Sequence, residues 1–178
     1  HTPGMIGRAL EHRPIGVHDP AGSCGVSSLL FETRRPFHPA RLHAALPTLA
    51  GDALRGRGQL WLASQPDTAV GWETAGQGIG LGSLGYWLAA LPEPRWQETS
   101  TLRRLASDAT WDPYYGDRRT ALAFIGLGPD TAALHDVLTG CLLTDEELAA
   151  GEESWRALPD PFAGYFPLTD TAFEENPA

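Results

Sequence analysis

Residues 122–142 read LAFIGLGPDTAALHDVLTGCL, and this stretch decides the class of the fold. Its first six residues form a nearly continuous apolar run of the length typical of a buried strand. After a Gly-Pro-Asp break, apolar residues recur at helical spacing, at Leu134, Val137, Leu138, Cys141 and Leu142. A buried strand followed at once by a helix with one apolar face predicts a sheet covered by helices.

Four other segments have the composition of strands. Residues 59–63 form an apolar run between Gly58 and Pro66, which is typical of a central strand. Residues 70–75 are expected to return antiparallel to it. The remaining strand candidates are residues 26–33 and 84–88.

Proline and polar residues mark the helix boundaries. Pro39 suits the first position of a helix, with His38 before it, and Pro47 should end or kink the same helix. Residues 144–147, TDEE, fit a capping box, and residues 99–111 are weakly helical. We therefore expect an α+β fold, with a mainly antiparallel sheet of about 4–5 strands and helices packed on one face.

One folded unit is expected between two irregular ends. A chain of 178 residues is the size of one ordinary domain. Residues 1–22 hold several Pro and Gly and little periodicity, so we expect a linker or N-terminal extension there. Residues 23–166 are expected to form the domain, and residues 167–178 an acidic tail.

The composition argues against several classes of protein. All 13 basic residues are arginine, whereas a P-loop, a Schiff-base enzyme and a kinase each need a lysine. The net charge of -9 argues against nucleic acid, because phosphate neutralisation supplies most non-specific affinity. No apolar run approaches the length of a membrane span, and two cysteines are too few for a disulfide framework. We therefore expect a cytoplasmic protein that binds neither nucleic acid nor membrane.

Residues 80–85, GLGSLG, match the G-x-G-x-x-G dinucleotide fingerprint letter for letter. That motif needs a long helix after it, whose N-terminus holds the pyrophosphate. Here Pro92 and Pro94 close the following segment within a turn or two. We therefore interpret the motif as a Gly-rich loop between strands.

A loose cluster of metal-ligating residue types comprises His12, His18, Asp19 and Cys24. Imidazole and thiolate suit Zn²⁺ or Co²⁺, but no pair has the spacing that presents two ligands from one rigid element. We expect no tightly bound cofactor, and we expect any zinc or cobalt binding to be weak and confined to residues 12–24. Cys141 lies within the apolar stripe and is expected to be a small core residue.

Arginine pairs occur at three expected strand ends, at residues 34–35, 55–57 and 118–119. If they converge on one rim of the sheet, they form a cationic patch suited to carboxylate or phosphate groups. The candidate interaction residues are Arg55, Arg57, Asp117, Arg118 and Arg119. Alternatively, Asp117 and neighbouring acids pair with these arginines, which are then structural. Within the group, we expect Arg119 to be the more structural and Arg57 the more functional.

Several short sequence motifs occur in the same order as in a known protein family. They are SLLF (28–31), RRPFHPARL (34–42), RGRGQLWLA (55–63), GDRR (116–119), FIG (124–126), LLTDEE (142–147) and DPF (160–162). Over about residues 25–162 the chain resembles the C-terminal domain of CobW-type proteins, which are GTPase metallochaperones. Arg57 departs from the family pattern, since lysine is common at this position.

The resemblance implies a non-catalytic accessory domain of a GTP-dependent zinc or cobalt chaperone, acting in metal homeostasis or cobalamin synthesis. The family's GTPase half, with its P-loop and Cys-rich metal motif, has no counterpart in these residues, so neither GTP hydrolysis nor tight metal transfer is carried over. The expected role is docking to the GTPase half, to a client metalloprotein or to another copy of the chain. The chain is then either an excised domain or a free-standing relative.

Two other functions stay open on the residues alone. A stand-alone metal-binding protein would use His12, His18 and Cys24. A small enzyme would use an arginine-lined site, although there is no Gly-x-Ser-x-Gly elbow and neither cysteine has a histidine close by in sequence.

Overall fold

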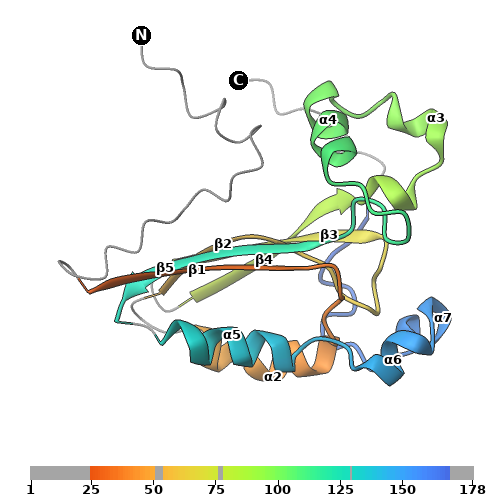
Figure 1. Cartoon of the computed structure of the whole chain (residues 1–178). Helices are drawn as coiled ribbons and strands as arrows, with labels where there is room; N and C mark the ends of the chain where they lie inside the picture. The colour runs from red at the N-terminus through yellow and green to blue at the C-terminus, as the bar shows by residue number, and fades with distance from the viewer. Residues whose placement is uncertain (1–24, 51–53, 76–77, 129, 169–178) are drawn as a thin grey trace, which may run out of the picture.

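A five-stranded antiparallel sheet lies at the centre of the molecule (Figure 1). This computed structural model describes residues 25–50, 54–75, 78–128 and 130–168. The strands are β1 (Val26–Thr33), β2 (Leu54–Leu60), β3 (Thr68–Ala75), β4 (Gly78–Tyr86) and β5 (Thr120–Leu127). Their order across the sheet is β1-β5-β2-β3-β4, and every neighbouring pair is antiparallel. The predicted antiparallel sheet is confirmed.

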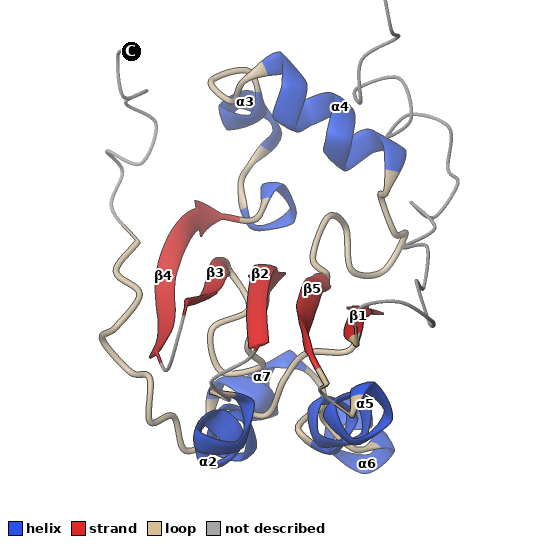
Figure 2. Ribbon diagram, turned by 90° about the vertical axis from the view of Figure 1, so that its left-hand side faces the viewer, coloured by secondary structure: helices blue, strands red, loops and turns tan. Residues whose placement is uncertain are grey.

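Helices lie on both sides of this sheet (Figure 2). The main layer contains α2 (Pro39–Leu49), α5 (Thr131–Gly140), α6 (Asp145–Ala149) and α7 (Glu152–Arg156). The other side carries the 3-10 helix η1 (Leu88–Ala90), α3 (Glu93–Trp96) and α4 (Thr101–Ala109). The α+β class is confirmed, with the main helical layer on one face; the position of α3 and α4 on the second side had no signal in the sequence.

The main core lies between the sheet and the pair α2 and α5. Phe31 pairs with Leu122 and Leu29 with Phe124 across β1 and β5, so these side chains share one face of the sheet. The helices meet them with buried Leu42, Leu49, Leu134 and Leu138. The apolar stripe in the 122–142 stretch therefore does cover the sheet, and Cys141 is a buried core residue as predicted.

A second cluster of buried residues contains Trp61, Trp87 and Trp155. Each indole N–H donates to a backbone carbonyl oxygen: Trp61 to Arg34 (3.1 Å), Trp87 to Thr68 (2.9 Å) and Trp155 to Glu147 (2.7 Å). Buried tryptophans with satisfied N–H groups combine apolar packing with fixed orientation. The cluster thereby fixes the connections that follow β1, β2 and β4.

Most helix boundaries follow the predicted signals. Asp130 accepts a hydrogen bond from the Ala133 amide at 3.0 Å, and Thr144 and Glu147 form the predicted capping box of α6. However, α2 does not end at Pro47 but continues to Leu49. Pro47 removes a single intrahelical hydrogen bond, and the burial of Leu49 in the core holds the last turn in place.

The end of β2 differs from the sequence-based expectation. The strand ends at Leu60, whereas we expected residues 59–63 to form it. Residues beyond Leu60 pair instead with Phe37, whose amide donates to the Trp61 carbonyl (3.1 Å) and whose carbonyl accepts from the Ala63 amide (2.9 Å). Residues 61–63 are thus apolar because they form a short connection that is buried on both sides. A continuous apolar run of this kind cannot be distinguished from a buried strand by its periodicity.

The two expected ends of the chain, residues 1–22 and most of 167–178, lie outside the described residues. Within the described ranges, no helix combines the length and apolar character needed to cross a bilayer.

Candidate functional site

The face of the sheet opposite α2 and α5 carries the candidate site, and we call it the open face (Figure 2). Its residues alternate along each strand with the core residues, because successive side chains point to opposite faces. Arg57 of β2, for example, pairs with Ala123 of β5 on one side and with Glu73 of β3 on the other. The register assigns to this face Ser28, Leu30, Glu32, Arg55, Arg57, Gln59, Gly71, Glu73, Gly80, Gly82, Leu84, Ala121, Ala123, Ile125 and Leu127.

Apolar side chains are exposed at both edges of the open face. Leu30, Ile125 and Leu127 at the β1–β5 edge are 45%, 51% and 64% exposed, and Leu84 on β4 is 52% exposed. Grouped exposed apolar residues rimmed by polar ones mark interaction surfaces more often than single exposed residues do. The open face therefore has the composition of a surface that meets another molecule.

Two exposed arginines lie on β2 in the middle of this face. Arg55 and Arg57 are opposite Ile125 and Ala123 in the register. Among the described residues, neither guanidinium has a hydrogen-bond or ion-pair partner within the usual distances, although Glu73 is the cross-strand neighbour of Arg57. These two predicted interaction residues are thus accessible and not committed to the fold.

Asp117 and Arg118, also predicted as interaction residues, are committed to the fold instead. Asp117 is 6% exposed, and its two carboxylate oxygens each accept a backbone N–H of η1, from Leu88 and Ala89, at 2.9 Å. The Arg118 side chain donates to the Pro66 carbonyl at 2.7 Å. Its guanidinium also lies 3.7 Å from the carboxylate of Asp67. The alternative of structural pairing therefore applies to Arg118, whereas Asp117 binds backbone amides and not an arginine.

The three arginine pairs do not converge on one rim. Arg34 donates to the carbonyls of Thr110, Gly116 and Arg118, which anchors the connection between α4 and β5. Arg35 donates to the carbonyl of Leu143 and pairs with Asp145. Arg55 and Arg57 are the second and fourth residues of β2, which begins earlier than the apolar run suggested. Instead, Arg55, Arg57 and Arg119 lie on the same face of the sheet, the open face.

Glycines form a shallow trough on this face between β2, β3 and β4. A groove of about 320 Å³ is lined by residues that include Arg57, Gly71, Gly80, Gly82 and Leu84. The GLGSLG motif lies inside β4 and pairs with β3, so our interpretation of it as a loop was wrong. Among the described residues no long helix follows the motif directly, so the helix N-terminus that would hold a pyrophosphate is missing, and the glycines leave the sheet surface flat.

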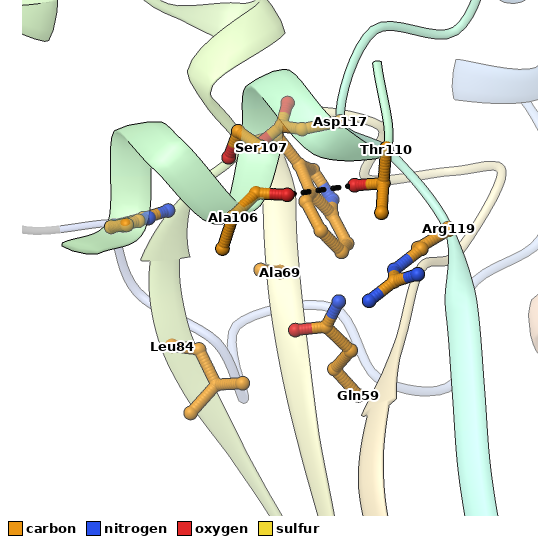
Figure 3. A pocket seen from close by; sticks show the side chains of 10 residues that line it. Gln59, Ala69, Leu84, Ala106, Ser107, Thr110, Asp117 and Arg119 are labelled. Carbon is orange, nitrogen blue, oxygen red and sulfur yellow. Dashed lines mark hydrogen bonds between the residues drawn. The ribbon is translucent and has the colours of Figure 1, made fainter. Parts of the chain in front are cut away.

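A deeper pocket of about 350 Å³ lies where α4 overhangs the open face (Figure 3). Gln59 and Arg119 project into it from β2 and from the start of β5, and Ser107 and Thr110 line it from the side of α4. Arg119 is partly exposed and, among the described residues, has no hydrogen-bond or ion-pair partner. The structural contacts at this end of β5 belong to Arg118, and the expectation that Arg119 is more structural than Arg57 stays a prediction.

The predicted metal ligands His12, His18 and Cys24, together with Asp19, lie outside the described residues. Within the described part of the chain, no three His, Cys, Asp or Glu side chains are grouped closely enough to hold a metal ion. Burial raises the pKa of the Cys141 thiol, which disfavours the thiolate that metal binding or nucleophilic attack requires.

Sequence reasoning missed the trough and the pocket. The alternation Arg-Gly-Arg-Gly-Gln in residues 55–59 was the available signal, since it places the three long polar side chains on one face and the glycines on the other. The pocket had no local signal because Gln59, Ser107 and Arg119 come from three separate segments.

The fold is an α+β domain whose sheet is covered by its main helical layer on one side only. The model of the family described as "Cobalamin synthesis protein cobW C-terminal domain" matches residues 26–142. The chain therefore belongs to the CobW C-terminal domain family.

The chain is also similar to proteins that have names. The zinc chaperone Rv0106 of Mycobacterium tuberculosis is 38% identical over 156 residues, which is 86% of this chain and 39% of that protein. The zinc-regulated GTPase metalloprotein activator 1 of Dictyostelium discoideum is 33% identical over 151 residues, covering 82% of this chain and 31% of that protein. A crystal structure of the Zn(II)-bound YjiA GTPase from E. coli matches 67% of this chain and 30% of that chain, at 15% identity and a TM-score of 0.44. The chain thus spans less than two fifths of the length of these relatives.

Proposed function

We propose that this chain is the accessory domain of a GTP-dependent zinc chaperone of the CobW type, and that it docks onto the GTPase region through its open face. The family match and the names of two relatives, a zinc chaperone and a zinc-regulated GTPase metalloprotein activator, support this class of function. Both names specify zinc, which favours zinc over cobalt as the metal of the system.

The observation that carries the docking proposal is the unpaired state of Arg55 and Arg57 beside exposed apolar residues. A charged surface of this kind guides encounter and fixes the register of a complex, while the apolar edges supply the contact area. Because the chain as a whole carries a net charge of -9, a local pair of free arginines selects an acidic partner surface. Client proteins and a second copy of this chain are the competing occupants.

The chain itself is proposed to bind and hydrolyse no GTP. It contains no lysine, and the glycine motif is engaged in the sheet through pairing with β3. In this proposal the nucleotide chemistry belongs to the GTPase region, and the accessory domain controls how that region meets its client. Calorimetry of GTP against the chain tests this point, and micromolar binding would contradict it.

The docking test uses the substitution Arg57→Gln, which removes one charge from the open face and breaks no described hydrogen bond or ion pair. We expect this variant to bind a separately produced GTPase region of a CobW-type protein more weakly, by about fivefold to tenfold, mainly through a slower association rate. Biolayer interferometry at two salt concentrations measures both rates. The melting temperature should stay unchanged.

Arg156→Gln is the matched control because it removes the same charge from α7, in the helical layer on the other side of the sheet. It should leave docking unchanged, whatever its small cost to stability. Equal loss of affinity in both variants would mean that net charge and not the open face determines binding. If light scattering shows the chain as a dimer that Arg57→Gln dissociates, the occupant of the open face is a second copy.

A further inference from the structure

The pocket beneath α4 is a candidate ligand site of its own (Figure 3). It has a volume of about 350 Å³, and its floor is the end of the open face. Trp87 and Leu84 form apolar walls, while Gln59, Ser107 and Arg119 supply polar groups. A concave site with apolar walls and a few convergent polar groups is the usual form of a small-ligand site.

Two donor groups face the same space in this pocket. Figure 3 shows the Arg119 guanidinium and the Gln59 side-chain amide directed toward one another across it. No acceptor among the described residues takes a hydrogen bond from either side chain. Partly enclosed donors without protein acceptors favour a ligand that brings acceptor oxygens, because each unmatched donor carries a desolvation cost.

The other charged residues of the pocket are already engaged. Both oxygens of Asp117 accept backbone amides of η1, and Arg103 donates to the carbonyl of Tyr86. The carboxylate of Asp117 is therefore held away from Arg119 and neutralised in part by the peptide N–H groups. Arg119 is the charged group of the pocket that is free to bind a ligand.

We propose that this pocket binds a carboxylate group, held by the guanidinium of Arg119 and the amide of Gln59. The planar fork of a guanidinium matches the two oxygens of a carboxylate, and a neutral amide adds a donor without adding charge. A dianionic phosphate is disfavoured, since the carboxylate of Asp117 offsets one of the two arginines that line the pocket, Arg103 and Arg119. The carboxylate belongs either to a free small molecule or to an acidic residue of a docked protein. The proposal does not depend on the function proposed above.

The test is an NMR titration of the ¹⁵N-labelled chain with sodium acetate, with sodium chloride at equal ionic strength as the reference. We expect acetate to shift the side-chain amide of Gln59 and the backbone amides of residues 107 and 119 in a saturable way. Arg119→Gln should weaken acetate binding at least about tenfold, because a charge-assisted bidentate contact is lost. Gln59→Leu, which keeps the volume but removes the donor, should weaken it less.

Arg156→Gln is the matched control, since it removes the same charge from α7, outside the pocket and on the other side of the sheet. It should leave acetate binding unchanged, and the melting temperature of each variant checks that its fold is intact. Shifts no larger than those from chloride, equal weakening by the control, or phosphate binding as tight as acetate binding would each overturn the proposal. Competition between acetate and the GTPase region would assign the carboxylate to a docked protein; saturable acetate binding without competition would assign it to a free ligand.

Discussion

The two faces of the sheet use the same residue types in opposite ways. On the helical side, Arg41 of α2 binds both carboxylate oxygens of Glu147 (2.9 and 2.5 Å) and the carbonyl of Leu142 (2.8 Å), which ties α2 to α6. On the open face, Arg55 and Arg57 have no described partner. This contrast supports the proposal that the open face meets another molecule, because exposed arginines with no described partner are available to it.

The glycines show the same contrast. A Cβ added to Gly58 of β2 would lie 2.0 Å from the carbonyl oxygen of Ala121, so the close approach of β2 and β5 requires glycine there. A Cβ added to Gly82 of β4 would meet nothing within 4 Å, and one added to Gly80 would make an ordinary contact. Folding therefore requires Gly58, whereas Gly80 and Gly82 on the open face are free of any packing requirement within the described chain.

The largest expected effect in this comparison comes from Gly58→Ala. The new methyl group would collide with backbone, which cannot move without breaking the β2–β5 ladder, so we expect a loss of about 3 kcal/mol in the free energy of unfolding. Urea denaturation followed by tryptophan fluorescence measures it. Gly82→Ala is the matched control and should change stability by less than about 0.5 kcal/mol. Similar losses in both would mean that glycine flexibility, and not the close approach, is what the fold needs.

The next effect separates two adjacent arginines. Arg118→Gln removes the donor to the Pro66 carbonyl and weakens the interaction with Asp67, so we expect it to cost about 1–3 kcal/mol. Arg119→Gln removes no described contact and should cost less than about 0.5 kcal/mol. Denaturation midpoints of the two variants decide the matter. The comparison would fail if Arg119→Gln were the more destabilising change.

Much of the fold was predictable because its signals are local. The bounds of β1, the amphipathic stripe of α5 and the capping box at Thr144 all follow from spacing within about ten residues. The end of β2 was not predictable, because residues 61–63 pair with Phe37 and not with a neighbouring strand. Nothing in the spacing of these apolar residues reveals that partner.

The candidate site was predictable only in part. The arginines could be identified by residue type, but their roles depend on carbonyl groups far away in sequence. Arg34 binds carbonyls 76–84 residues away, and Arg118 binds one 52 residues away. No local pattern distinguishes such an arginine from Arg57, which binds none of the described residues. Only tertiary structure separates anchoring arginines from available ones.

The smallest expected effect concerns the charge of Glu147 on the helical side. Hydrogen bonds from the Arg41 side chain, aided by the amide of Thr144, lower the pKa of Glu147 from 4.5 to about 2. A carboxylate with a lowered pKa in the folded state stabilises the fold above the pKa of the unfolded state. This stabilisation is therefore fully present above pH 4.5 and is lost as the pH falls toward about 2. Because 29% of the side chain is exposed, solvent screening limits its size to about 1 kcal/mol.

Glu147→Gln tests this assignment because glutamine resembles the protonated acid. Above pH 4.5 the variant should unfold about 1 kcal/mol more easily than the unaltered chain, and the two should become equal near pH 2. Burial lowers the pKa of the neighbouring His38, so protonation of His38 destabilises the fold as the pH drops below 6.5. This loss of stability occurs in both proteins and largely cancels when their free energies of unfolding are subtracted. Arg57→Gln is the open-face control, and its stability difference from the unaltered chain should not depend on pH over this range. A constant difference between Glu147→Gln and the unaltered chain down to about pH 2 would show that the Arg41–Glu147 pair contributes through shape and not through charge.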